Sequence, residues 1–478
     1  MSMRTSFTQV ARPLAFAALA VAVSAALVTP RTAQASAFQL KENSAKGLGR
    51  AFAGSGAAAG DASVVVNNPA AMTLLKGTVV QADVTAINFS ARFSGSATDA
   101  FGRPLSGGDG GDAGTTIPVP AFFAATQIND RVHLGFGLSA PFGFRTNYDY
   151  GWVGRYNALK SDFQSVAATF SGSYDLTDDF TVGASFIAQR TKAELTSAIN
   201  FNTVGLGMIQ QGVAAGAIPP AQAAAYMAQV NAVVPPGTDG IARIKGNDWG
   251  YGWQLGALWK ITDKDSLGFN YHSKISNTLT GNATFTVPAN VTALLSSPQI
   301  QPLLAGSGGV PFTDTTGSAG FTTPAFASLS YWHQDEKYGF GVDVGWTKWS
   351  TFKDLRVRYN NPAQPDSVEV FDWKNTIFAS LGGEYYVNDK LTLRAGIATD
   401  RSPVSVAHRD PRVPDADRRW ITLGLGYKPT PKLDFNVGYA HIFVSKARID
   451  NLSPTNDRLV GNFKDKGNLL SFSVAYHY

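Results

Sequence analysis

Cysteine is absent from the sequence, and histidine is scarce. None of the 478 residues is cysteine, so disulfide bonds, thiolate nucleophiles and cysteine-ligated metals are excluded. The six histidines form no H-x-x-x-H pair and flank no recognisable nucleophile motif. We therefore expect a protein that is not an enzyme, and we predict no catalytic residue, metal site or cofactor.

Charged side chains are also few, and long apolar runs are missing from the chain that follows the N-terminal signal. Charged residues make up 16% of the chain, against ~25% in an average protein. A net charge of +5 without a clustered basic tract argues against a nucleic-acid partner. After residue 36, no run reaches the roughly 18 apolar residues of a helical membrane span.

The N-terminus has the pattern of a secretory signal. Arg4 and Arg12 precede the apolar stretch from Leu14 to Val28, and Ala33-Gln34-Ala35 is a small-x-small cleavage site. We expect residues 1–35 to be removed, so that the mature chain begins at Ser36. An exported chain with 48 glycines, 12% aromatic residues, few charges and no helical span is typical of a membrane β-barrel.

Alternation of apolar and polar residues supports an all-β fold. In "LLSFSVAYHY", residues 469–478, Phe472, Val474 and Tyr476 alternate with Ser471 and Ser473. This pattern also fits a soluble β-sandwich, because any half-buried strand alternates with period two.

Loop lengths favour the barrel over the sandwich. Fourteen candidate strands follow one another, and their connections alternate between tight turns such as Asn129-Asp130 and long segments such as 402–417. Short turns at one rim and long loops at the other characterise outer-membrane barrels. We predict a transmembrane antiparallel β-barrel of about 14 strands, wide enough for a lumen.

Several stretches resemble one known family. They are "SAFQLKENSAKGLGRAFAG", "ASVVVNNPAAMTLL", "SAPFGFRTNYDYGWVGRYNALKS", "WTKWSTFKDLRV" and "LRAGIATDRSPV…VPDADRRWITLGLGY". From Ser36 to the C-terminus the chain resembles the FadL-type outer-membrane transporters. The resemblance implies uptake of long-chain fatty acids or, as in some members, aromatic hydrocarbons.

The family resemblance also implies a domain arrangement. Residues 36–76 would form an N-terminal plug, or hatch, inside the lumen. Residues 77–478 would form the barrel in the Gram-negative outer membrane, with long extracellular loops at 199–246 and 286–321. We expect a monomer surrounded by outer-membrane lipids.

Three residues match positions that the family uses to bind its ligand. Arg190 in "AQRTKAEL" and Arg356 in "WSTFKDLRV" match basic residues that bind a carboxylate, and Phe38 matches an aromatic that contacts the ligand. Arginine suits this role because its guanidinium can form two hydrogen bonds to a carboxylate. Alternatively, both arginines are rim charges and Phe38 is plug packing. Strand parity groups Arg190 with Phe186, so either a bulge reverses the direction of the Arg190 side chain or the residue lies beyond the bilayer.

The segment "VNNPAA" raises the possibility of a lateral gate. Proline prevents Asn67-Asn68-Pro69-Ala70 from continuing the apolar run as a strand. We expect these residues to contact the third strand near 135–143, where Gly135, Gly137 and Pro141 weaken the sheet. The alternative is a plain turn leading into the first strand.

Two long loops have the composition of a capture surface. Segments 199–246 and 286–321 are apolar and nearly uncharged, with short helices expected on both sides of Pro219-Pro220 and near "VPANVTALLSSPQIQPLL". They could form an apolar groove or an inert lid. The predicted function is uptake of a hydrophobic molecule by loop capture, lumen binding and lateral exit, with an aromatic-hydrocarbon channel and a general diffusion porin as alternatives.

Overall fold

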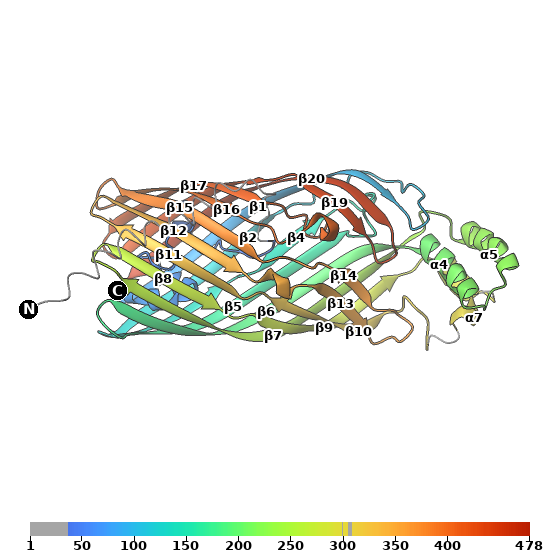
Figure 1. The fold of residues 1–478 in the computed structure, drawn as a ribbon, viewed down its shortest axis with the longest axis horizontal. Coiled ribbons are helices and arrows are strands. Elements are labelled where there is room, and N and C mark those ends of the chain that lie inside the picture. Colours follow the sequence, from blue (N-terminus) through green and yellow to red (C-terminus); the bar gives the residue numbers. More distant parts are fainter. Residues whose placement is uncertain (1–36, 299, 305–307) are drawn as a thin grey trace, which may run out of the picture.

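One curled sheet makes up most of the structure. The computed structural model describes residues 37–298, 300–304 and 308–478. The predicted signal peptide, residues 1–35, therefore lies outside the described residues. None of the helices in the described part of the chain is both apolar and long enough to cross a membrane. The strands instead run side by side around one long cylinder (Figure 1).

Twenty strand segments form the sheet. They are β1 (Thr78–Thr98), β2 (Thr116–Asn129), β3 (Val132–Ser139), β4 (Gly143–Asn147), β5 (Lys160–Asp175), β6 (Phe180–Asn200), β7 (Asp239–Lys260), β8 (Asp265–His272), β9 (Ile275–Thr286), β10 (Thr315–Thr323), β11 (Phe326–Gln334), β12 (Tyr338–Thr347), β13 (Asp354–Tyr359), β14 (Ser367–Val370), β15 (Thr376–Tyr386), β16 (Leu391–Asp400), β17 (Arg418–Thr430), β18 (Leu433–Val444), β19 (Ala447–Leu452) and β20 (Arg458–His477).

The sheet closes into a barrel of fourteen wall strands. Every pairing is antiparallel, and β1 pairs with both β2 and β20, which leaves neither end of the sheet free. Six wall positions hold two consecutive segments, for example β8 and β9, which both pair with β7. The other divided positions in the described chain are β3–β4, β10–β11, β12–β13, β14–β15 and β18–β19. This confirms the predicted fold class.

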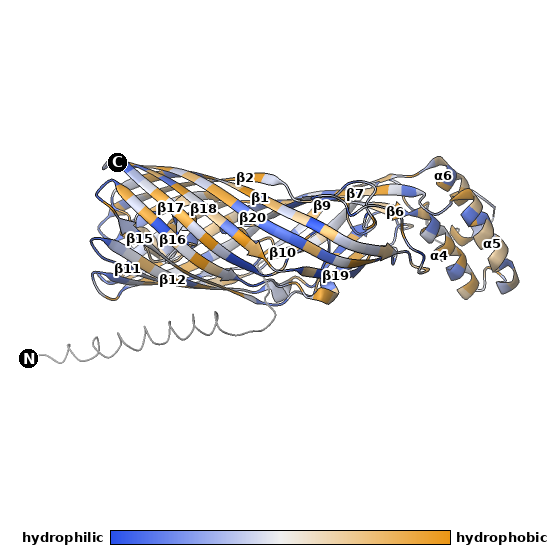
Figure 2. Ribbon diagram, turned by 90° about the horizontal axis from the view of Figure 1, so that it is seen from above, coloured by the Kyte–Doolittle hydropathy of each residue, from blue (hydrophilic) through white to orange (hydrophobic). Residues whose placement is uncertain are grey.

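Apolar side chains cover the outside of the barrel. In β20, Phe472 and Val474 are 49% and 39% exposed, whereas Ser471 and Ser473, which alternate with them, are buried. Figure 2 shows this alternation of apolar and polar residues along neighbouring strands. An apolar outer face with a polar interior is the arrangement expected when lipid surrounds the barrel.

The long loops are shorter than predicted because their flanking strands extend further. β6 continues to Asn200 and β7 begins at Asp239, so the predicted 199–246 loop is reduced to residues 201–238. It contains the two expected helices, α4 (Phe201–Ala214) and α5 (Pro220–Val233). The next long loop contains α6 (Ala289–Leu295) and α7 (Gln301–Leu304), and all four helices lie beyond one rim (Figures 1 and 2).

The segment from Ala37 to Lys76 packs against the inner face of several strands. It contains α2 (Ala45–Gly49), α3 (Val64–Asn67) and the 3-10 helix η1 (Pro69–Leu74). α2 contacts β17 and β18, whereas η1 contacts β5, β6 and β7. The backbone carbonyl of Arg50 lies so close to Gly382 that a Cβ there would approach it to 2.1 Å. Only glycine therefore fits this approach.

The run Val64–Val66 is helical, although its residues favour a strand. It belongs to α3, which ends at Asn67; Asn68 caps that helix and also precedes η1, which begins at Pro69. The Asn68 side chain accepts a hydrogen bond from the N–H of Ala70 (3.2 Å). A cap of this kind, followed by proline in the first helical turn, favours a new helix over a strand.

Candidate ligand-binding site

Phe38 lies at the centre of a buried aromatic cluster. Its ring centroid is 4.9 Å from Trp349, 5.2 Å from Phe163 and 5.5 Å from Trp373. Only 3% of Phe38 is exposed. The residue therefore sits inside the barrel, while its contact with a ligand stays a prediction.

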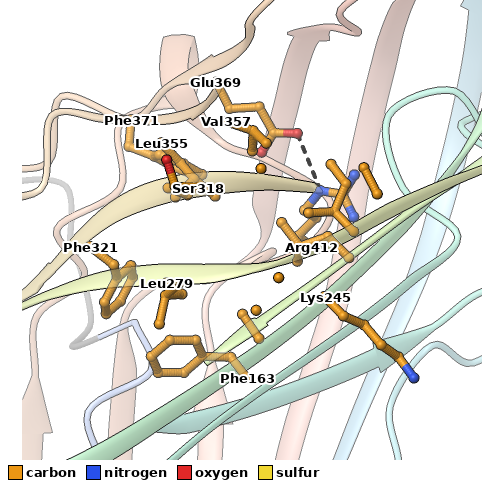
Figure 3. A pocket seen from close by; sticks show the side chains of 18 of the residues that line it. Phe163, Lys245, Leu279, Ser318, Phe321, Leu355, Val357, Glu369, Phe371 and Arg412 are labelled. Atoms are coloured by element: carbon orange, nitrogen blue, oxygen red, sulfur yellow. Dashed lines mark hydrogen bonds and ion pairs between the residues drawn. The ribbon is translucent and has the colours of Figure 1, made fainter. Parts of the chain in front are cut away.

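A narrow apolar cavity of about 70 Å³ adjoins this cluster, and we call it the Phe38 cavity. Figure 3 shows Phe163, Leu279 and Phe321 along one side, with Arg412 and Glu369 joined by an ion pair at the other end. Other lining residues are Phe38, Leu355 and Val357. A mostly apolar lining with a few polar groups is typical of small-molecule sites.

Arg412 is the buried cation at this cavity. Its side chain is 6% exposed, and its Nε lies 3.3 Å from a Glu369 carboxylate oxygen. A terminal guanidinium nitrogen also donates to Ser161 Oγ (3.2 Å) and to the carbonyl of Thr196 (3.3 Å). These contacts hold the guanidinium rigidly, so it can present a donor to an anion.

A second carboxyl group lies beside Arg412. Asp410, in the loop between β16 and β17, accepts a hydrogen bond from the Arg412 backbone N–H (2.7 Å). Burial and the neighbouring Glu369 raise the pKa of Asp410 to about 7, while Arg412 opposes this rise. The charge around Arg412 consequently changes near neutral pH.

The two arginines predicted to bind the ligand lie on the outer face, which corrects that prediction. Arg190 is exposed and alternates with buried Gln189 and Thr191. Arg356 pairs with Asp366 (3.2 Å) and is also exposed. Period-two alternation explains both positions, because the neighbours of each arginine in its strand face inward.

Two larger cavities share lining residues with the Phe38 cavity. The mouth cavity, about 950 Å³, lies between α4 and the barrel and shares Leu355, Val357 and Arg412 with it. The wall cavity, about 530 Å³, shares Phe144, Phe163 and Arg412 with it. Arg412 therefore lines all three cavities: the mouth cavity, the Phe38 cavity and the wall cavity.

The third wall strand is interrupted where the sequence predicted weakness. β3 ends at Ser139 and β4 begins at Gly143. Residues 38–40 of the N-terminal segment form hydrogen bonds with the backbone at this interruption. The Leu40 N–H donates to the Pro141 carbonyl, and the Gly143 N–H donates to the Phe38 carbonyl, both at 2.9 Å. Backbone groups released by the break are thus paired from inside the barrel.

The break leaves a gap in the barrel wall. β2 pairs with β3 only from Phe122 onward, and β4 pairs with β5, so in the described structure residues 116–121 and 143–147 do not pair with each other. Pro118 and Pro120 of β2 line the wall cavity at this edge, together with Phe144 and the outward-facing Val166. Proline is tolerated there because an unpaired edge needs no N–H donor.

The predicted gate residues fall into two groups. A Cβ at Gly135 would lie 2.6 Å from Met72 Sδ, and one at Gly137 would lie 2.8 Å from Val66, so the N-terminal segment does pack on β3. Asn67 lines a small cavity that Pro141 also lines.

The remaining hatch residues contact a different part of the wall, which corrects the prediction. Asn68 donates to the Ala257 carbonyl (3.0 Å), and Pro69 and Ala70 approach Gly183 and Gly256. They therefore pack on β6 and β7, because glycines there leave room for the backbone of η1.

The sequence of the chain is similar to that of known outer-membrane proteins. A family model described as outer membrane protein transport protein (OMPP1/FadL/TodX) matches residues 26–478. The chain belongs to this family. It is 29% identical over 447 residues to outer membrane protein P1 of Haemophilus influenzae, covering 91% of this chain and 92% of that protein.

Two further relatives extend over nearly the whole chain. The long-chain fatty acid transport protein of Escherichia coli strain K12 is 28% identical over 488 residues, covering 100% of both chains. The crystal structure of a Pseudomonas aeruginosa FadL homologue superposes with a TM-score of 0.82 at 30% identity, covering 92% of this chain and 99% of that one. This FadL-family chain is thus an outer-membrane β-barrel transporter for hydrophobic molecules.

Proposed function

We propose that this FadL-family protein takes up long-chain fatty acids and releases them sideways into the outer membrane. The observation that carries the proposal is the series of three cavities, which runs from the loops to a gap in the wall and shares the buried cation Arg412. An apolar path with a cation shared by all three cavities suits a molecule with a long apolar tail and one acidic head.

Capture begins at the mouth cavity. The helices of the long loops pack around their own apolar core, which includes Leu206, Ile209, Val230 and Leu294. Val204 and Met208 of α4, together with Phe312, line the adjoining mouth cavity. A dissolved acyl chain would gain by leaving water there, at about 0.8 kcal/mol for each buried methylene.

Binding in the Phe38 cavity requires movement. About 70 Å³ is the space of roughly two water molecules, which is too small for an acyl chain. The Phe38 side chain fills the centre of the cluster, so its displacement would provide the missing volume. The ligand carboxylate would then replace Glu369 as a partner of Arg412.

The same movement would affect the wall. Phe38 holds the Gly143 N–H through its own carbonyl, so displacing segment 38–40 would free the edge of β4. The wall cavity lies at that edge and is lined by both half-buried Leu40 and outward-facing Val166. Exit through the gap returns the tail to an apolar environment without passing through water.

Two alternatives predict different ligands. An aromatic-hydrocarbon channel would use the same apolar path without needing Arg412. A general diffusion porin would need an open aqueous lumen, whereas the N-terminal segment of this chain occupies the barrel interior with buried contacts.

Uptake by a deletion strain discriminates among these ligands. We expect a strain lacking the protein to lose uptake of oleate at low concentration and to regain it with the wild-type chain. Toluene uptake should change little. Restoration of toluene uptake without oleate uptake would favour the aromatic-hydrocarbon channel instead.

A further inference from the structure

A group of basic side chains covers one side of the outer wall near the long-loop rim. It comprises Arg145, Lys160, Arg190, Lys192, Arg243 and Lys245, and we call it the outer basic patch. These residues come from β4, β5, β6 and β7, which are consecutive neighbours in the wall (Figure 1). All lie on strand positions that alternate with inward-facing residues.

Carboxylates offset only part of this charge. Glu194 alone accepts ion pairs from Lys160 (3.4 Å), Arg243 (2.8 Å) and Lys245 (3.3 Å). Asp162 pairs with Arg145 at 2.6 Å. Six cations thus share two outward-facing carboxylates, so the patch keeps an excess of positive charge.

Two of the cations have no acidic partner among the described residues. Arg190 donates to the Asn247 side chain (3.2 Å) and lies 5.8 Å from the Trp249 ring. Lys192 takes part in no salt bridge within the described part of the chain. The Asp248 carboxylate, the next acidic group along β7, instead accepts from the backbone N–H of Thr278 (2.7 Å).

The position of the patch relative to the membrane follows from aromatic residues. Trp249, Tyr251 and Trp253 form an exposed row on β7, as expected of the girdle at a membrane interface. Arg190 is opposite Trp249 in the register, and Lys245 lies four residues further toward the loops. The patch therefore starts at the girdle and extends roughly 20 Å along the strands toward the long-loop rim.

We propose that the outer basic patch binds the phosphate groups of an anionic lipid in the outer leaflet. Long loops mark the external side of such barrels, so the patch faces that leaflet. Arginine and lysine side chains form charge-assisted hydrogen bonds with phosphate, and arginine can do so with two donors. The apolar wall below the girdle would contact the acyl chains of the same lipid.

Lipid binding by the purified full-length protein in detergent tests this proposal. The probe is lipid A carrying two phosphates, and the affinity is compared between wild type and Arg190→Gln/Lys192→Gln. We expect the affinity to fall by about tenfold or more, because two cations near the lipid phosphates are lost. Dephosphorylated lipid A should bind both proteins equally weakly, and inorganic phosphate should compete poorly.

Matched variants separate the patch from general charge. Lys390→Gln/Lys432→Gln removes two exposed lysines from the short-turn rim, and it should leave the affinity unchanged. Glu194→Gln should tighten binding several-fold, because it removes the shared carboxylate. Heat-dependent mobility on gels verifies that each barrel is folded.

Three results would overturn the proposal. The first is an equal loss of lipid A affinity in Arg190→Gln/Lys192→Gln and in the control Lys390→Gln/Lys432→Gln. The second is equal binding of phosphorylated and dephosphorylated lipid by the wild type. The third is weaker binding after Glu194→Gln in a folded barrel.

Discussion

Arg412 is the residue that distinguishes an acid from a neutral ligand in this account. It is the buried cation that lines all three cavities, and its ion-pair partner is Glu369. A charge-assisted hydrogen bond contributes roughly 1.5–3 kcal/mol to the free energy of binding. Losing the hydrogen bond between Arg412 and the ligand carboxylate should therefore lower the ligand affinity measurably.

Replacing Arg412 by glutamine should therefore weaken oleate binding about tenfold or more. Binding of the corresponding long-chain alcohol should change little, because the alcohol has no carboxylate. Calorimetry or fluorescence displacement can measure both affinities. Arg190→Gln and Arg356→Gln are matched controls on the outer face and should bind oleate normally. Equal losses for acid and alcohol would remove Arg412 from the head-group site.

The Asp410 carboxyl gives this site a pH dependence. Since burial and Glu369 raise its pKa to about 7, the group is mostly neutral below that pH and charged above it. Its negative charge would oppose a carboxylate ligand, so oleate should bind several-fold more tightly at pH 6 than at pH 8. In Asp410→Asn the dependence should disappear. An unchanged pH profile in that variant would exclude this role.

Sequence could place some residues of the site but not others. Strand parity already grouped Arg190 with Phe186, and the outer-face position follows that parity. Arg412 was not predicted because it lies in a loop, where no periodicity reports which side chains face the lumen. Its contacts with Ser161 and Thr196 come from residues more than 200 positions away.

At the scale of elements, the N-terminal segment is tied to the wall by one buried ion pair. Arg50 lies 2.6 Å from Glu384, which also pairs with Arg394 (3.1 Å). Both ends of the Arg50–Glu384 pair are almost fully buried. Removing one partner of such a pair costs about 3–5 kcal/mol when a buried charge is left without compensation.

Arg50→Met should loosen the segment without unfolding the barrel, because Arg394 still neutralises Glu384. We expect larger and more frequent single-channel openings than in the wild type, which should conduct almost no ions. Arg419→Met, an exposed arginine on β17, is the control. Wild-type conductance in Arg50→Met would mean that this ion pair does not hold the plug.

The loop helices are elements whose loss the barrel should tolerate. Deleting residues 201–233, which contain α4 and α5, removes about half of the apolar loop core but no wall strand. Oleate uptake should fall most strongly at low concentration, because capture is lost while the Phe38 cavity remains. Normal uptake at low oleate in a folded barrel would identify the helices as an inert lid.

Element boundaries show where local sequence information ends. Alternation predicted the wall strands correctly within the membrane, where lipid imposes apolar outer residues. β7 continues beyond that region with charged outer residues such as Arg243 and Lys245, so its start at Asp239 was missed. The end of β6 at Asn200 lies close to the predicted loop boundary at residue 199. Pro118 and Pro120 could have indicated the unpaired edge of β2, since a fully paired strand would exclude them.

At the scale of the whole molecule, the described strands close into a barrel through the pairing of β1 with β20, and β2 and β4 leave a gap at the third wall position. The central claim is that ligand leaves through that gap rather than through the periplasmic end. The absence of cysteine allows a clean test, because any disulfide must come from introduced residues.

The decisive measurement is oleate uptake with the gap bridged by a disulfide. One cysteine is placed within 117–120 of β2 and the other within 143–146 of β4, while Thr126→Cys/Leu134→Cys bridges a paired part of β2 and β3 as the control. With the gap bridge formed, uptake should stop while external binding persists, and reduction should restore uptake. The control bridge should have no effect. Normal uptake through a barrel whose gap bridge is verified as oxidised would contradict lateral exit.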